Sequence, residues 1–308
     1  MPKNLPHISK NFIVPLNMNN LRGRMFIAPK TSQKSKTNFL IVYGQKSTLE
    51  KWSSLANELR QYGNVIMPDL PGFGGMESFY KIKEAPTLDN FADYLASFIK
   101  LKFRSKPFVI VGLSFGFVVA TRMLQKYPEL SNKVIIIINI SGFINKYDLK
   151  ISKLKRVELL TYTKIFSYSF SSNFYRAIAY DKRIFLKIKN NSRNEDKELL
   201  KQNKMVLKLL KKNDTRTHMY TLNQLFKLDN THKKIELPVW SLIGNYDEYL
   251  KQENVKKNLE SVYLKYHEIK LKSSGHSLNY SNLNEEDITN LIPYKLKVLL
   301  NRQNRKQS

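Results

Sequence analysis

Residues 108–116 decide the fold, with the sequence Phe-Val-Ile-Val-Gly-Leu-Ser-Phe-Gly. The apolar run 108–111 predicts a buried strand, and the apolar spacing over 115–127 predicts a helix. Between them lies a Gly-x-Ser-x-Gly pattern, a tight strand-to-helix turn that strains the serine backbone and needs small flanking residues. We therefore predict that Ser114 is a nucleophile. The competing interpretation is that Ser114 is not a nucleophile and only caps the helix that begins at Phe115.

Strand and helix patterns alternate on both sides of this stretch. Apolar or β-branched runs predict further strands at residues 11–15, 24–28, 38–43, 64–67, 133–140, 238–244 and 267–271. Apolar residues at helical spacing predict helices that begin at Thr48 and at Thr87, and a third helix over residues 251–259. A C-terminal helix is also predicted, with a kink or break at Pro293. This order predicts an α/β fold with a mostly parallel central β-sheet flanked by helices.

The block 144–236 lacks strand signals and separates two predicted strands. It contains helical pieces at residues 154–166, 198–212 and 217–228. A helical insertion at this place is typical of a mobile lid over an active site. We therefore predict an α/β core made of residues 1–143 and 237–308, with residues 144–236 inserted as a helical lid.

The formal net charge is +27 and is unevenly distributed. The predicted lid contains 22 Lys and Arg residues but only 9 Asp and Glu residues, a surplus of 13 positive charges. The simpler interpretation is a solvated, lysine-covered surface. The alternative is weak association with an anionic membrane surface, which lid aromatics would support at Phe166, Tyr168, Phe170, Phe174 and Tyr175. Arg-rich or aromatic-interleaved runs are absent from the sequence, so no specific nucleic-acid partner is predicted. Oligomeric state leaves no signal in this sequence.

The chain contains no cysteine, which excludes disulfides, thiolate zinc sites and a cysteine nucleophile. The N-terminal residues show no apolar core of a secretory signal. The longest apolar run, residues 134–138, is too short to span a bilayer. These features predict a cytoplasmic protein.

A serine nucleophile needs a base that accepts its proton near neutral pH, which favours histidine. His276 lies in a loop after the last predicted strand, where α/β sheets place groups that face a ligand. We predict His276 as the base. The other histidines lie in less suitable places, namely the N-terminal arm, the lid block and its edge, and a strand interior: His7, His218, His232 and His267.

The carboxylate that orients the base is expected between serine and histidine in the chain. Asp247 follows the strand 238–244 and is our prediction, although it could instead cap the next helix. Asp148 is the second choice and Glu248 the third. Two backbone N–H groups must hold the oxyanion, and we assign these to Phe115 and Gln45. For the loop that contains Gln45, the alternative is that Gly44 only ends the preceding strand.

The sequence resembles the α/β-hydrolase superfamily. The resemblance covers roughly residues 10–143 and 237–300, and its motifs follow the family order: Tyr43-Gly44-Gln45, residues 69–74, Gly112 to Gly116, Gly244 to Asp247, and Gly275-His276. Two departures stand out, namely Tyr43 where many relatives have histidine, and bulky Phe117 where many have glycine. The resemblance implies two-step acyl transfer by Ser114, His276 and Asp247, without a metal or organic cofactor.

The motifs specify a reaction type better than a substrate. The first hypothesis is hydrolysis of a small or medium carboxylic ester through an acyl-enzyme. A second keeps the triad but cleaves a C–C or amide bond, or passes the acyl group to another acceptor. A third, non-catalytic hypothesis is a binding module at a membrane surface.

Overall fold

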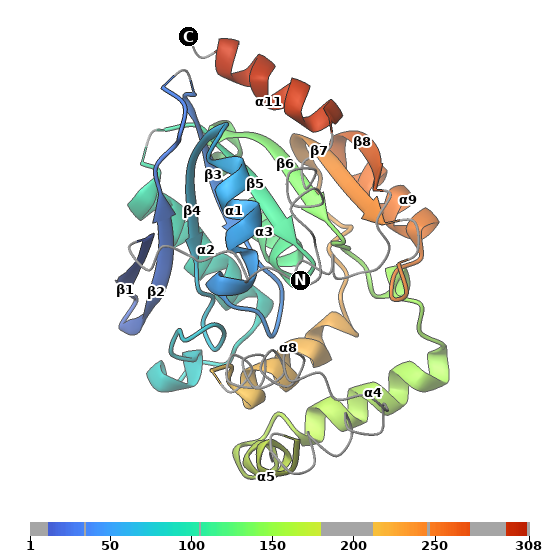
Figure 1. Cartoon of the computed structure of the whole chain (residues 1–308). Coiled ribbons are helices and arrows are strands. Elements are labelled where there is room, and N and C mark those ends of the chain that lie inside the picture. Colours follow the sequence, from blue (N-terminus) through green and yellow to red (C-terminus); the bar gives the residue numbers. More distant parts are fainter. Residues whose placement is uncertain are drawn as a thin grey trace, which may run out of the picture.

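The computed structural model describes residues 12–33, 35–104, 106–179, 212–244, 247–271 and 294–306. These residues form one sheet in the order β1-β2-β4-β3-β5-β6-β7-β8 (Figure 1). The strands are β1 (Ile13–Met18), β2 (Leu21–Ala28), β3 (Thr37–Val42), β4 (Gly63–Pro68), β5 (Phe108–Leu113), β6 (Val134–Ile140), β7 (Ile235–Gly244) and β8 (Tyr263–Leu271). β1–β2 and β2–β4 pair antiparallel, and the remaining pairs are parallel. The predicted mostly parallel sheet is confirmed.

Helices connect the parallel strands. They are α1 (Ser53–Leu59), α2 (Leu88–Lys102), α3 (Phe115–Lys126), α9 (Gln252–Val262) and, at the C-terminal end, α11 (Tyr294–Lys306). In the sheet order, the connection from β3 to β4 leads toward β1, whereas the connections from β5 to β6 and from β7 to β8 lead toward the opposite edge. Because such crossovers are right-handed, α1 covers one face and α3 and α9 cover the opposite face. Both faces of the sheet are thus flanked by helices, as predicted.

The antiparallel edge shows how local chemistry sets element boundaries. Asn19 and Asn20 both have positive φ, 52° and 59°, and form a two-residue turn between β1 and β2. Such turns match the twist of a hairpin and favour asparagine. The strands therefore run closer to the turn than predicted, and β1 begins at Ile13. Pro293, the predicted interruption of the C-terminal helix, lies outside the described residues.

Between β6 and β7 the described elements are all helical. They are η5 (Lys146–Asp148), α4 (Lys153–Ile165), α5 (Ser169–Ala179) and α8 (Thr215–Leu225). This helical insert fits a cap or lid, and Figure 1 shows it at one end of the sheet. Residues 198–211 of the predicted helix 198–212 lie outside the described part of the chain. The division at residues 143 and 237 stays a prediction, and β7 begins slightly earlier, at Ile235.

The lid helix α8 packs on loops that leave the carboxyl ends of β3 and β4. Gln45 Nε2 donates to Thr221 Oγ1 at 2.7 Å, and Asp214 N donates to Gly72 O at 2.7 Å. A further hydrogen bond of 2.7 Å joins Leu88 N to Gln224 Oε1. These contacts place α8 over the edge of the sheet where a parallel α/β fold presents its ligand-facing loops.

Candidate active site

Ser114 sits at a strained turn between β5 and α3. Its φ is 48° and its ψ is −116°, a conformation that costs on the order of 1–3 kcal/mol for a residue with a side chain. Its N–H donates to Ile140 O at 3.0 Å, which ties the turn to the end of β6. The Ser114 side chain makes no hydrogen bond that caps α3. The geometry therefore favours the predicted nucleophile, which is half-buried, over a capping residue.

The two glycines of the pattern are required by close backbone contacts. A Cβ on Gly116 would lie 2.0 Å from Val42 O, and a Cβ on Gly112 would lie 2.7 Å from Phe117 Cα. Both distances are far below van der Waals contact, so any side chain at either position must displace the backbone. The strand β3, the turn and α3 are thus packed backbone against backbone.

The loop after β3 lies directly against the nucleophile. A Cβ on Gly44 would be 3.3 Å from Ser114 Cβ and 3.7 Å from Phe115 N. The next residue along the chain is Gln45. Within the described chain, neither the N–H of Gln45 nor that of Phe115 donates a hydrogen bond. The arrangement suits the two predicted oxyanion donors, which need an acceptor that only a reacting substrate would supply.

A buried polar network holds this loop, and the sequence did not predict it. Tyr43 Oη donates to Asp69 Oδ1 at 2.7 Å, and Asp69 Oδ2 accepts from Arg24 Nε at 3.0 Å. Arg24 also binds Glu50 at 2.7 Å. Burial raises the pKa of Asp69 to about 6, against the lowering effects of Arg24 and Tyr43. Tyr43, one of the two departures from the family pattern, therefore acts as a support for the loop.

Phe117, the second departure, fills space between α3 and the far end of the sheet. Its ring is fully buried and lies 6.0 Å from the ring of Tyr263, at the start of β8. A Cβ on Gly142 would meet the same phenylalanine at 2.6 Å. The bulky side chain thus tightens the contact between helix and sheet.

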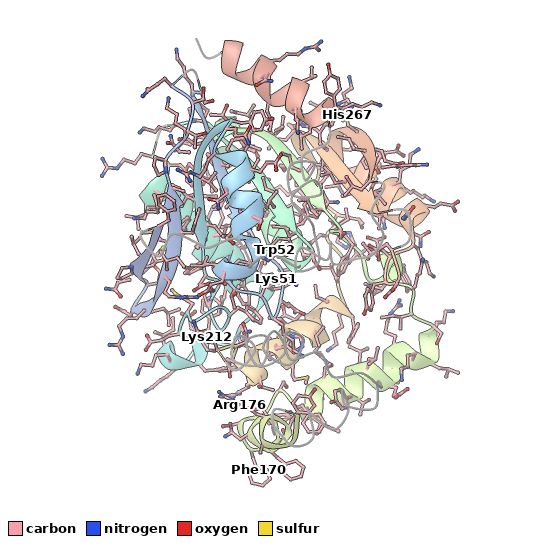
Figure 2. All side chains as sticks on the ribbon, viewed as in Figure 1. Lys51, Trp52, Phe170, Arg176, Lys212 and His267 are labelled. Carbon is pink, nitrogen blue, oxygen red and sulfur yellow. The ribbon has the colours of Figure 1, made fainter. Side chains whose placement is uncertain are left out.

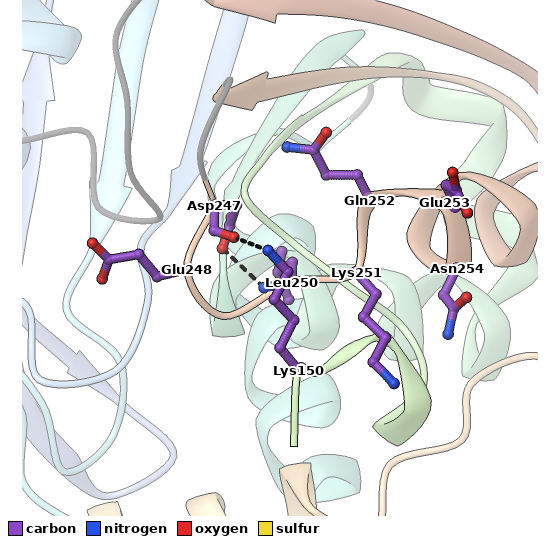
Figure 3. Close-up of a pocket in the computed structure, with 8 residues that line it drawn as sticks. All are labelled: Lys150, Asp247, Glu248, Leu250, Lys251, Gln252, Glu253 and Asn254. Carbon is purple, nitrogen blue, oxygen red and sulfur yellow. Dashed lines mark hydrogen bonds between the residues drawn. The ribbon is translucent and has the colours of Figure 1, made fainter. Parts of the chain in front are cut away.

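Asp247 lies in the loop after β7 and is 3% exposed. Its Oδ1 accepts a hydrogen bond from Tyr249 N–H at 2.9 Å. Figure 3 shows two further bonds, from Leu250 N–H to Oδ1 at 2.9 Å and from Lys150 Nζ to the Asp247 carbonyl oxygen at 2.6 Å. The next helix, α9, has Lys251 at its N-cap. Asp247 is therefore held rigidly by its own loop and does not cap α9.

A hollow of about 620 Å³ borders this loop (Figure 3). Its lining is mostly ionisable and consists of Lys150, Asp247, Glu248, Leu250, Lys251, Gln252, Glu253 and Asn254. These residue types differ from the mostly hydrophobic and aromatic side chains that line pockets for apolar ligands. We regard it as a feature of the loop that carries the acid.

The two other carboxylates have different surroundings. Asp148 is fully buried, and its oxygens accept from the N–H groups of Ile144 and Asn145 and from the Asn258 side chain. These bonds give it a structural role at the start of the lid. Glu248 is exposed, and its side chain points away from Asp247 in Figure 3. Asp247 is the carboxylate that combines burial with a place at a strand end.

His276, the predicted base, lies outside the described residues, as does His7. β8 ends at Leu271, which pairs with Gly244, so the chain leaves the sheet level with the strand end that leads to Asp247. Five residues extend up to roughly 17 Å, enough to cross several strand spacings of about 4.8 Å. The described termini are therefore compatible with the predicted pairing of His276 with Asp247 and Ser114.

The remaining histidines occupy distinct environments. His267 lies in β8, where its ring stacks on Trp240 at 4.3 Å, and Figure 2 shows it far from the lid. His232 is exposed and lies 3.4 Å from Asp229. His218 is buried in α8, close to the loop that carries Gln45. The sequence placed it in the lid but gave no sign of this proximity.

Comparison with known proteins agrees with the fold. The strand order and the helical insert are those of an α/β-hydrolase enzyme. The chain belongs to the family described as Serine aminopeptidase, S33, whose model matches residues 33–278. No curated protein matches the sequence.

Solved structures with this fold share little sequence with the chain. An esterase from Thermogutta terrifontis has a TM-score of 0.64 at 15% identity, covering 93% of this chain and 98% of its own. An enol-lactonase from Burkholderia xenovorans has a TM-score of 0.62 at 10% identity, with 94% and 98% covered. At such identities the likeness establishes the fold. Among the described helices, none combines the length and apolar character needed to cross a bilayer.

Proposed function

We propose that the protein hydrolyses a carboxylic ester of a small or medium acyl substrate through a covalent acyl-enzyme. The observation that carries this proposal is the strained Ser114, with its hydroxyl outside the helix cap and the Gly44 loop packed against it. A strained serine beside two N–H groups that donate to no acceptor in the described ranges is suited to attack on a carbonyl.

In the proposed reaction, His276 accepts the proton of Ser114 while the serine oxygen attacks the carbonyl carbon. The N–H groups of Gln45 and Phe115 hold the oxyanion, and the alcohol leaves with the proton carried by His276. Water then attacks the acyl-enzyme as His276 takes a proton from it, which releases the acid and regenerates Ser114. We assign Asp247 to the orientation of His276.

Hydrolysis of p-nitrophenyl esters with acyl chains of increasing length tests this proposal. We expect turnover by the wild-type protein and loss of turnover in Ser114→Ala, with a preferred chain length set by the lid. Equal turnover by both proteins would contradict the assignment of Ser114.

The second candidate keeps the same residues but cleaves an amide bond. The family description, a serine aminopeptidase, favours it. Aminoacyl p-nitroanilides distinguish the two, because an amide hydrolase would turn them over faster than the matched esters relative to the uncatalysed rates. Cleavage of a C–C bond or transfer to another acceptor uses the same acyl chemistry and stays open to product analysis.

The lid surface supports a separate proposal of weak association with an anionic membrane. Phe166 and Tyr175 pack on each other at 5.3 Å, but Tyr168, Phe170 and Phe174 are mostly exposed. Figure 2 shows Phe170 at the outer edge of α5, pointing away from the core. Aromatic rings beside lysines suit an acidic lipid surface. Sedimentation with anionic but not neutral liposomes would support it, and binding to neither would refute it. The cytoplasmic location stays a prediction.

A further inference from the structure

Lys46 is a half-buried cation beside the proposed oxyanion loop. It directly follows Gln45 and has a positive φ of 50°. No hydrogen bond or ion pair joins its ammonium group to any residue in the described ranges. Nearby cations are paired differently, since Arg24 binds Glu50 and Asp69, and Lys212 lies 3.6 Å from Glu50. Lys46 is therefore a half-buried cation two residues beyond Gly44, the residue that packs on Ser114, and it has no carboxylate partner in the described chain.

His218 faces the same loop from the lid. Its side chain is 6% exposed, and its Nδ1 is buried without a hydrogen-bond partner among the residues described. It lies one helical turn before Thr221, the residue that accepts from Gln45 Nε2, so both share the face of α8 that meets the loop. A buried ring nitrogen without a partner costs on the order of 1–3 kcal/mol, which makes it a good candidate to bind a ligand.

The two groups have complementary protonation. Burial lowers the pKa of His218 well below its ordinary value, and the ammonium of Lys46 lowers it further. His218 is thus neutral at pH 7 and offers one N–H donor, while Lys46 supplies one positive charge. One cation and one neutral donor match a carboxylate, whereas a doubly charged phosphate would require more donors.

We propose that Lys46 and His218 bind a free carboxylate of the substrate, so that the enzyme acts on the monoester of a dicarboxylic acid. The inference rests on the proposed function, because the subsite adjoins Gln45 of the proposed oxyanion hole. The Gln45–Thr221 contact joins loop and lid at this point, so a bound carboxylate would bridge the core and the lid.

Monomethyl glutarate and dimethyl glutarate test the proposal in a pH-stat, because they differ only in the free carboxylate. We expect the wild-type protein to prefer the monoester by about 10-fold or more in kcat/KM. Lys46→Met and His218→Leu should lower kcat/KM for the monoester roughly 10- to 100-fold, mainly through KM, and change that for the diester less than about 2-fold. Methionine is chosen because its unbranched side chain replaces the aliphatic part of Lys46 and, like lysine, must adopt the positive φ at this position.

Two further variants sharpen the test. His218→Asn should retain most of the preference, because its amide nitrogen takes the position of Nδ1. Lys227→Met, which removes an exposed lysine just after α8, should behave as wild type. A wild-type preference for the diester, or equal losses on both esters in Lys46→Met, would overturn the subsite and leave the proposed function standing.

Calorimetry separates the subsite from the chemistry. Ser114→Ala should bind monomethyl glutarate, and addition of Lys46→Met should weaken that binding at least about 10-fold. If neither ester is turned over and Ser114 does not react with a fluorophosphonate, the proposed function fails. The calorimetric result then still decides the subsite, since unchanged binding in the double variant refutes it.

Discussion

Gly44 packs so closely on Ser114 that a methyl group added to it would lie 3.3 Å from Ser114 Cβ and 3.2 Å from Leu113 O. The loop that would hold the oxyanion and the turn that carries the nucleophile are therefore in direct contact. Small displacements of one must change the geometry of the other.

The first prediction concerns this contact. Gly44→Ala should push the loop away by a few tenths of an ångström and lower kcat for ester hydrolysis roughly 10-fold, because a misplaced donor stabilises the oxyanion less well. KM should change little. Steady-state kinetics with a p-nitrophenyl ester checks this, and unaltered kcat in the folded variant would show that the loop takes no part in catalysis.

A second prediction concerns the acid. Asp247→Asn should keep the hydrogen bonds from Tyr249 and Leu250 but lower kcat by roughly 10³- to 10⁴-fold, because a neutral amide does not stabilise a charged histidine. Glu248→Gln is the matched control at the exposed neighbouring position and should retain activity. If the two variants lost activity to the same extent, the choice of Asp247 would be wrong.

The packing of the nucleophile turn gives a third prediction. Gly116→Ala places a Cβ 2.0 Å from Val42 O, a backbone atom of β3 that cannot rotate aside. We expect a loss of about 1–3 kcal/mol in the free energy of unfolding, measured by urea denaturation. An unchanged midpoint would mean that β3 and α3 are less tightly packed than described.

Tyr43 provides a fourth prediction. Tyr43→Phe removes one of the hydrogen bonds to the fully buried Asp69 carboxylate and should destabilise the fold by roughly 1–3 kcal/mol. Tyr147→Phe, at a half-exposed tyrosine, is the matched control and should stay within about 0.5 kcal/mol of wild type. Equal unfolding free energies for all three proteins would argue against the network.

The fifth prediction is a pH dependence. Burial alone would raise the pKa of Glu50, but hydrogen bonds from Arg24 and the charges of Arg24 and Lys212 lower it to about 2. Because the folded value lies below the ordinary one, this stabilisation is complete above about pH 4.5 and is lost as the pH falls toward 2. The shift of the Glu50 pKa corresponds to about 3 kcal/mol of stabilisation. Unfolding free energies of Glu50→Gln should therefore fall less steeply over this range than those of wild type.

Local patterns made the sheet and the tight turn at Ser114 predictable. Ser114 is flanked by glycines, a strand and a helix within twenty residues, so its turn is encoded locally. Asp247 was placed by the strand before it. The support of the oxyanion loop was not predictable, because Tyr43, Asp69, Arg24 and Glu50 meet only after β2, β3 and β4 have paired. The nearness of His218 to Lys46 likewise depends on how α8 docks on the core, over a separation of more than 170 residues.

If Ser114 is an activated nucleophile, a fluorophosphonate probe will react with it. We expect folded wild-type protein to be labelled with a single adduct on Ser114, as located by peptide mass spectrometry. Ser114→Ala, with the same circular dichroism spectrum, should not be labelled. Absence of labelling in the folded wild type, or equal labelling of both proteins, would contradict the account.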